Sequence, residues 1–216
     1  MRIDTKLIRE ALADPLPLPA LGSSIDSSRA RPAAVVVPLR LDPEPVTVVV
    51  LRGSQLKDHG GEVGFPGGKP DPGDADLTAT ALRELEEEVG VAASDVEICG
   101  PLNPMPVITG RYLIHPFVGA LAPGAAPRVA SKEVARVLTL PLLPLLTGEQ
   151  PIGAIRGEWN GALIFAPHFP LDGCVLYGAS AYILYELLAR LANRLGSPLP
   201  APVIEQEPPW GSRYAR

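Results

Sequence analysis

The chain has 216 residues, and 46% of them are hydrophobic, which is enough for one domain with a sizeable core. A formal net charge of −5 at pH 7 argues against a nucleic acid as its main partner. No apolar run is long enough to span a membrane, and the two cysteines, Cys99 and Cys174, lie far apart in the sequence. We therefore expect a cytoplasmic protein without a disulfide framework.

The N-terminal part of the chain predicts a short helix, a loop and two strands. Leucine, isoleucine and alanine share one side of a helix over residues 4–14, and residues 15–31 are rich in Pro, Ser and Gly, as loops are. The β-branched, apolar runs 33–41 and 46–52 predict strands, with a proline-rich turn at 43–45. Because both runs are almost continuously apolar, we expect a sheet that is covered on both faces.

A second helix is predicted over residues 79–88, where Ala, Leu, Arg and Glu predominate. Asp74 or Asp76 can cap its N-terminus, and Gly90 stands where the helix is expected to end. These signals fix the position of the helix, so the faces of its side chains can be predicted.

Three glutamates, Glu84, Glu87 and Glu88, fall at positions i, i+3 and i+4 and therefore share one face of this helix. Carboxylates gathered in this way repel each other unless a cation binds among them, and oxygen ligands suit Mg2+, Mn2+ or Ca2+. The preceding segment, 65–68, predicts a tight turn that lets a backbone carbonyl face the helix. Arg83 is placed to hold a carboxylate by a bidentate contact. The plainer interpretation is a solvated acidic face.

The stretch 83–91, RELEEEVGV, resembles the second half of the Nudix box, R-E-U-x-E-E-x-G-U, in which U is an apolar residue. Gly68 resembles the glycine that opens the box. The full pattern is G-x5-E-x7-R, whereas here the span from Gly68 to Arg83 is one residue longer and the upstream glutamate is absent. Asp74 or Asp76 stands in its place.

The loop before the box carries a longer motif. Residues 51–68 resemble the coenzyme A pyrophosphatase branch of the Nudix family, with the pattern L-x-x-R-S-x-x-L-x-x-H-x-G-E-V-x-F-P-G-G. The matching residues are Arg52, Leu56, His59, Gly61, Glu62, Val63 and 65–68. Arg52, Lys57 and His59 can meet phosphate oxygens, although a single histidine in a loop is more often a surface residue. Gly53 replaces the usual serine.

Strands are predicted over 96–101 and 112–121, separated by a loop over 103–111. Residues 109–119 are similar to the segment T-G-y-x-V-x-P-f-V-g of the same branch, and Arg111 and Tyr112 within it are candidates for contacting a nucleotide. Residues 131–142 resemble the segment S-x-x-E-V-x-x-V that follows the box. Its glutamate, Glu133, either reaches the metal site from outside the helix or is a surface residue.

The C-terminal part predicts a short helix at 142–146, a hairpin turn at 159–161 and a helix over 179–195 with a leucine-rich core stripe. Residues 197–216 are Pro-rich and either pack as an extended arm or have no fixed structure. The resemblance implies a division into an N-terminal helix and loop (1–32), a Nudix hydrolase domain (33–195) and a Pro-rich tail (196–216).

The order of elements predicts an α+β or α/β protein. The resemblance implies the Nudix fold, a mixed β-sheet sandwiched between helices, and a small-molecule nucleotide substrate for a monomer or homodimer. It further implies hydrolysis of the diphosphate of coenzyme A or acyl-CoA to 3′,5′-ADP and 4′-phosphopantetheine or its acyl form, with Mg2+ or Mn2+ as cofactor. ADP-ribose or a dinucleoside polyphosphate is an alternative substrate. A non-catalytic nucleotide-binding domain is an alternative of another class.

The resemblance also implies roles for individual residues. Glu84 and Glu88 are the expected primary metal ligands, assisted by Glu87 and the carbonyl of Gly67. Arg83 orients them. A glutamate of the helix or Glu133 is expected to act as general base on water, and Arg52, His59, Arg111 and Tyr112 are expected to bind substrate.

Overall fold

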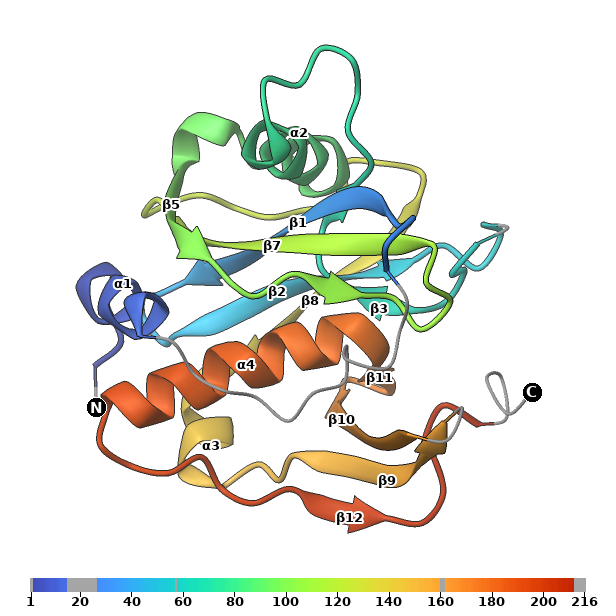
Figure 1. Cartoon of the computed structure of the whole chain (residues 1–216). Helices are drawn as coiled ribbons and strands as arrows, with labels where there is room; N and C mark the ends of the chain where they lie inside the picture. The colour runs from blue at the N-terminus through green and yellow to red at the C-terminus, as the bar shows by residue number, and fades with distance from the viewer. Residues whose placement is uncertain (1, 15–26, 57, 160–161, 212–216) are drawn as a thin grey trace.

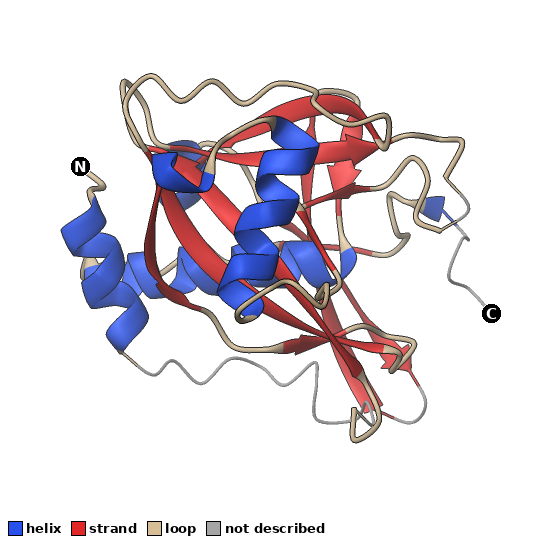
Figure 2. Ribbon diagram, turned by 90° about the horizontal axis from the view of Figure 1, so that it is seen from above, coloured by secondary structure: helices blue, strands red, loops and turns tan. Residues whose placement is uncertain are grey.

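The computed structural model describes residues 2–14, 27–56, 58–159 and 162–211, which form a mixed β-sheet with helices on both faces (Figures 1 and 2). Helix α2 (Leu77–Val89) covers one face, and α4 (Gly178–Arg194) with α1 (Thr5–Ala13) covers the other. The predicted α+β arrangement is confirmed. Within these ranges, no helix combines the length and hydrophobicity needed to cross a membrane.

The predicted apolar strands form the centre of the sheet. Strand β1 (Arg31–Arg40) pairs antiparallel with β2 (Val46–Arg52) across the proline-rich turn. It pairs in parallel with β7 (Tyr112–Leu121), so Arg31 lies opposite Tyr112 at the start of both strands. The two ends of these strands thereby become the places where residues distant in the sequence meet.

The order of strands is β12-β9-β10-β11-β3-β2-β1-β7-β5, and three further strands lie off this path, β4 on β1, β6 on β7 and β8 on β2. The predicted loop 103–111 contains one of them, β6. The remaining elements are β3 (Val63–Gly64), β4 (Gly67–Gly68), η1 (Ala93–Asp95), β5 (Val96–Pro101), β6 (Met105–Pro106), β8 (Val134–Pro141), α3 (Leu142–Thr147), β9 (Gly153–Trp159), β10 (Ala162–Leu171), β11 (Cys174–Leu176) and β12 (Val203–Glu205).

The alternating side chains of β1 and β2 enter two separate cores. Ala34 and Val36 pack with Leu85 and its neighbours on α2, whereas Val37 and Leu39 belong to the larger core beneath α4. Burial of apolar surface on both sides is the main source of stability for such a sheet. It confirms the expectation that continuously apolar strands are covered on both faces.

The glycine-rich segment after β2 differs from the predicted tight turn. After β3 (Val63–Gly64) the chain bends at Pro66 and forms a two-residue strand, β4 (Gly67–Gly68), antiparallel to β1. A side chain at position 67 would not fit, because its Cβ would lie 2.3 Å from the carbonyl oxygen of Ala34. Glycine at position 67 therefore allows β4 and β1 to pair closely. A local turn pattern does not predict this pairing.

The C-terminal arm returns to the sheet after α4. Strand β12 pairs in parallel with β9, and Glu205 in it lies 3.2 Å from Nε2 of the buried His168 on β10. Of the two alternatives for the Pro-rich tail, the extended arm is correct for the described residues up to 211. The predicted hairpin turn at 159–161 lies largely outside the described residues, although β9 and β10 pair antiparallel on either side of it.

Candidate active site

The three glutamates lie on α2, whose ends the sequence signals define. Asp76 is the cap, because its Oδ1 accepts a hydrogen bond of 2.8 Å from the backbone N–H of Ala79. Gly90 ends the helix with a φ of 65°, and its N–H donates to the carbonyl of Glu86. The apolar face, which includes Leu85, packs on the sheet, so the glutamates project toward the neighbouring loops.

Asp74 has a different role from Asp76. Its two oxygens accept bidentate hydrogen bonds from Arg83, of 3.0 Å from Nε and 3.1 Å from Nη2. This contact holds the pKa of Asp74 well below its usual range. Of the two aspartates that the sequence offers in place of the box glutamate, Asp74 is the one that contacts Arg83.

Arg83 uses its remaining donors on the helix glutamates and on the chain after the glycines. Nη1 lies 3.0 Å from Glu84 Oε1 and 3.3 Å from Glu87 Oε2, and Nη2 donates to the carbonyl of Lys69 across 3.0 Å. The predicted bidentate contact thus goes to Asp74, while Nη1 alone contacts one oxygen of Glu84 and both oxygens of Glu87. Arg83 ties the helix to the segment that follows β4.

Glu88 is the buried member of the glutamate set, with 4% of its surface exposed. Its Oε2 accepts a hydrogen bond of 3.3 Å from the N–H of Gly67, and its Oε1 accepts one of 3.3 Å from Arg52. Burial raises the pKa of Glu88 to about 7. A carboxylate with this proton affinity gains strongly from any further positive charge.

Glu84 lies against the second glycine of the segment. A Cβ on Gly68 would lie 2.2 Å from Glu84 Oε1, so glycine at this position leaves the space that the carboxylate occupies. Burial also raises the pKa of Glu84 above its ordinary value. Gly67 therefore leaves room for the backbone of β1, whereas Gly68 leaves room for the Glu84 side chain on α2.

Arg52 joins the helix to Glu133. At the end of β2 its Nη1 contacts Glu88, and its Nη2 lies 3.1 Å from Glu133 Oε2. The register of β2 and β8 shifts between Leu51 and Arg52, and the N–H of Gly53 donates to the Glu133 carbonyl. Arg52 thus contacts both Glu88 and Glu133, although the Glu133 side chain is 57% exposed. The Arg52 Nε is buried and has no hydrogen-bond partner among the described residues.

His59 and Glu62, two residues of the loop motif, contact each other. Nδ1 of His59 lies 2.9 Å from Glu62 Oε2, and this hydrogen bond raises the pKa of His59. The Glu62 carbonyl in turn accepts from the N–H of Arg52. The loop is therefore connected to the glutamates through the main chain of Arg52, while the imidazole itself is largely exposed. Lys57, the other basic residue of the loop, lies outside the described residues.

Tyr112 begins β7 and Arg111 directly precedes it; their described contacts are with β1, with Lys69 after β4 and, through the Tyr112 carbonyl, with the N–H of Val107. The carbonyl of Arg111 accepts from the N–H of Arg31, and the hydroxyl of Tyr112 accepts from Arg31 Nη2 across 2.9 Å. Lys69 Nζ lies 5.5 Å from the centre of the Tyr112 ring. The structure thus adds Arg31 and Lys69 to the candidate residues.

The residues around α2 provide the donors that a hard divalent cation prefers. Among the described residues, no three His, Cys, Asp or Glu side chains are close enough together to hold a metal ion as they stand. The guanidinium groups of Arg52 and Arg83 neutralise the carboxylates instead. The donor set nevertheless fits Mg2+ or Mn2+, because it consists of carboxylate oxygens beside glycines that allow the main chain to approach closely.

A family model described as the NUDIX domain matches residues 29–153, more than half of the chain. The chain belongs to the NUDIX family. The matched range contains Arg52, the glycine-rich segment, α2 and Glu133, so all residues of the carboxylate site lie within the NUDIX domain.

Curated NUDIX relatives carry the name "Uncharacterized Nudix hydrolase NudL". The protein from Photorhabdus laumondii subsp. laumondii is 40% identical over 121 residues, which are 56% of this chain and 64% of the relative. The protein from Escherichia coli strain SMS-3-5 is 41% identical over 116 residues, which are 54% of this chain and 60% of the relative. The chain thus spans less than two thirds of the length of these relatives.

Among solved structures, the NUDIX domain of Shewanella oneidensis NrtR complexed with ADP ribose is 22% identical, with a TM-score of 0.44 over 64% of this chain and 85% of that chain. A MutT/nudix family protein from Enterococcus faecalis is 13% identical, with a TM-score of 0.48 over 85% of this chain and 71% of that chain.

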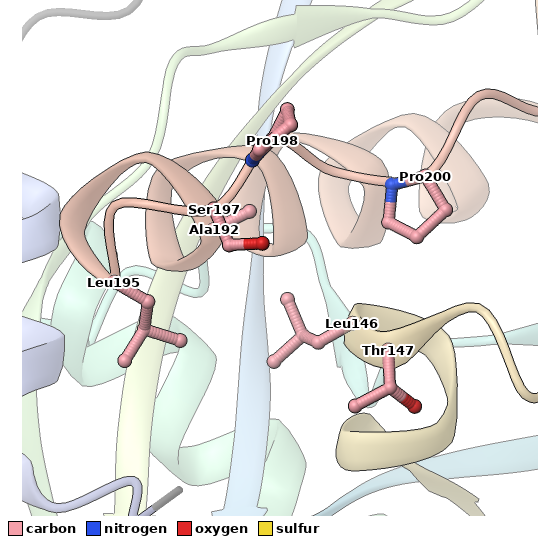
Figure 3. Close-up of a pocket in the computed structure, with 7 residues that line it drawn as sticks. All are labelled: Leu146, Thr147, Ala192, Leu195, Ser197, Pro198 and Pro200. Carbon is pink, nitrogen blue, oxygen red and sulfur yellow. The ribbon is translucent and has the colours of Figure 1, made fainter.

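A hollow of about 380 Å³ lies elsewhere on the protein, between α3 and the chain that leaves α4 (Figure 3). Leu146 and Thr147 project toward it from α3, and Leu195 and the proline-rich segment close it from the other side. None of the candidate residues lines this hollow. It is therefore separate from the carboxylate site.

Proposed function

We propose that this NUDIX protein hydrolyses the diphosphate of coenzyme A or acyl-CoA with the help of Mg2+ or Mn2+, giving 3′,5′-ADP and 4′-phosphopantetheine or its acyl form. The observation that carries the proposal is the position of Arg52. It belongs to the loop motif that resembles coenzyme A pyrophosphatases, and its side chain contacts both Glu88 and Glu133. The motif that suggests the substrate and the carboxylates that suggest the chemistry therefore share one residue.

The metal ligands in this proposal are Glu84, Glu87 and Glu88, assisted by the carbonyl of Gly67. When bound, a divalent cation would neutralise the charge of the diphosphate and increase the acidity of a coordinated water. The bidentate contact with Asp74 fixes the guanidinium of Arg83, which in turn contacts the ligands Glu84 and Glu87.

The protein groups supply a base and anion-binding donors. Water attacks one phosphorus, the P–O bond to the bridging oxygen breaks, and the proton of the water passes to a glutamate of α2 or to Glu133. Glu133 is suited to this role because its side chain is more exposed than that of Glu88 and is held by Arg52. The guanidinium of Arg52, whose side chain is 27% exposed, is the donor proposed to meet a phosphate oxygen.

Mass spectrometry of products tests the proposal. Coenzyme A, ADP-ribose and a dinucleoside tetraphosphate are each incubated with the protein and Mg2+ or Mn2+ in oxygen-18 water. We expect 3′,5′-ADP and phosphopantetheine from coenzyme A, with the label on the product that contains the attacked phosphorus. Glu88→Gln serves as the inactive control, with Glu86→Gln, on the same helix but exposed, as the matched active control.

The other outcomes distinguish the alternatives. Cleavage of ADP-ribose or the tetraphosphate while coenzyme A survives would retain the hydrolase and refute the proposed substrate. Binding of coenzyme A by calorimetry without cleavage of any of the three compounds would instead favour a non-catalytic nucleotide-binding domain.

A further inference from the structure

Two cations flank one tyrosine where three strand ends meet. The guanidinium carbon of Arg31 lies 4.9 Å from the centre of the Tyr112 ring, and Lys69 Nζ lies 5.5 Å from it. Arg31 and Tyr112 are paired across β1 and β7, while Lys69 directly follows β4, which pairs with β1. Three segments distant in the sequence therefore contribute one side chain each to this cluster.

The cluster carries an excess of positive charge. In the described part of the chain, neither Arg31 nor Lys69 forms an ion pair with a carboxylate, whereas Arg52 and Arg83 do. Each of the two cations makes a cation–π contact with the same Tyr112 ring. Because the Tyr112 hydroxyl accepts its hydrogen bond from Arg31, its own proton remains available to an acceptor.

These donors match the charge and acceptors of a phosphate monoester. Such a group carries about 1.5 to 2 negative charges at pH 7 and has three acceptor oxygens. Guanidinium, ammonium and phenol groups supply N–H and O–H donors, and two unit charges balance the dianion. A neutral base or sugar would leave both cations without a counterion.

The cluster is adjacent to the carboxylate site and distinct from it. The carbonyl of Lys69 accepts from Arg83, which contacts Glu84 and Glu87, whereas the side chain of Lys69 lies over Tyr112. The preceding residue, Gly68, lies directly against Glu84. Residues 68 and 69 therefore connect the glutamates with the cluster.

We propose that Arg31, Lys69 and Tyr112 bind a phosphate monoester of the substrate, separate from the diphosphate at the carboxylate site. They select nucleotides that carry a phosphate on the ribose. This inference rests on the proposed function, which it deepens, since coenzyme A carries such a phosphate and 3′-dephospho-coenzyme A does not.

Calorimetric titration in EDTA, where no turnover occurs, tests the inference directly. We expect the wild-type protein to bind coenzyme A about tenfold to a hundredfold more tightly than 3′-dephospho-coenzyme A, as removal of charge-assisted hydrogen bonds commonly costs. The double variant Arg31→Met, Lys69→Met should lose this preference while it retains its affinity for the dephosphorylated compound. Tyr112→Phe should lose part of it.

Control variants remove cations of the same kind elsewhere. Arg40 lies at the other end of β1, and Lys6 lies on the exposed side of α1. The variants Arg40→Met and Lys6→Met should both keep the preference for coenzyme A over 3′-dephospho-coenzyme A. Equal affinity of the wild type for the two ligands, or absence of binding by both, would overturn the inference. The inference would also be overturned if the double variant lost affinity for both ligands by the same factor.

The kinetic experiment separates this inference from the proposed function. With Mg2+, the double variant should raise KM for coenzyme A by a similar factor and leave kcat within about twofold, because the cluster lies away from the broken bond. If the wild type cleaves both compounds with equal kcat/KM, the phosphate-binding role of the cluster is refuted and the proposed hydrolase function stands. A preference in binding without any cleavage would refute the hydrolase and keep the cluster.

Discussion

The guanidinium of Arg52, at the end of β2, lies 3.3 Å from the carboxylate of Glu88, in the last turn of α2. This contact connects the loop that precedes the glycine-rich segment with the most buried acidic group of the candidate site. The charge state of Glu88 and the position of Arg52 therefore depend on each other, and both can be tested on the metal-free protein.

Glu88→Gln is expected to stabilise the metal-free protein at high pH. Between about 4.5 and about 7, the folded state holds a proton on Glu88 that the unfolded chain has lost, so the free energy of unfolding falls as the pH rises. At pH 8 in EDTA the variant should exceed the wild type by up to about 3 kcal/mol, since a tenfold change in proton affinity is about 1.4 kcal/mol. Urea unfolding at several pH values measures this.

The same variant should lose about a hundredfold or more in turnover with saturating Mg2+. A gain in stability that persists undiminished at about pH 3, where Glu88 is protonated in both states, would mean that the charge of Glu88 is not its source. Turnover close to that of the wild type would refute Glu88 as a metal ligand.

Arg52→Met is expected to have the opposite effect on stability. The variant leaves Glu88 buried without its cation, so at pH 8 in EDTA the free energy of unfolding should fall by about 1 to 3 kcal/mol. The loss should shrink at pH 5, where Glu88 is neutral. Arg136→Met, which removes the partner of the exposed Asp172, is the control and should change stability by less than about 1 kcal/mol. Equal losses in both variants would exclude a special role for the Arg52 pair.

We expect Asp74 to be needed mainly for activity and Asp76 mainly for stability. Asp74→Ala removes the bidentate partner of Arg83, and kcat/KM should fall about tenfold to a hundredfold, as for other residues that orient metal ligands. Asp76→Ala removes the helix cap and should lower the free energy of unfolding by about 1 kcal/mol with little effect on kcat/KM. Thermal unfolding and initial rates on both variants would decide, and reversed effects would contradict the assignment.

Replacement by alanine is expected to lower stability at Gly67 and to lower mainly activity at Gly68. Gly67→Ala meets a strand backbone, so it should lower the free energy of unfolding by about 1 to 3 kcal/mol. Gly68→Ala meets the end of the Glu84 side chain, which can move, so activity should fall more than stability. Gly73→Ala, with no atom within 4 Å of its Cβ, is the neutral control. Circular dichroism melts together with initial rates distinguish the three variants.

Local sequence signals were sufficient for α2 and its acidic face. The cap at Asp76 and the stop at Gly90 act within one helical turn, so a short stretch of sequence contains all the information needed. The same holds for the apolar strands, whose burial on both faces follows from their composition alone. The choice between Asp74 and Asp76 did not follow, because it depends on where the loop brings each carboxylate relative to Arg83.

The contacts that the sequence did not predict join residues far apart in the chain. Arg31 meets Tyr112 because β1 and β7 pair in parallel, and parallel register leaves no local signal. Gly67 and Gly68 resemble a turn in sequence, yet pairing with β1 makes them a strand. Lys69 follows the opening glycine of the box directly, and that proximity was the one signal that pointed to it.

The three residues of β12 have a consequence for how copies of this protein behave toward each other. They occupy the outer side of β9 from Gly153 to Ile155, where unpaired backbone groups would otherwise be free to pair with a strand of another molecule. Because β12 is so short, the new outer edge it creates offers few backbone groups of its own. The C-terminal arm thus protects the sheet from growing by intermolecular strand addition, and a chain cut before residue 203 should aggregate more readily than the intact one.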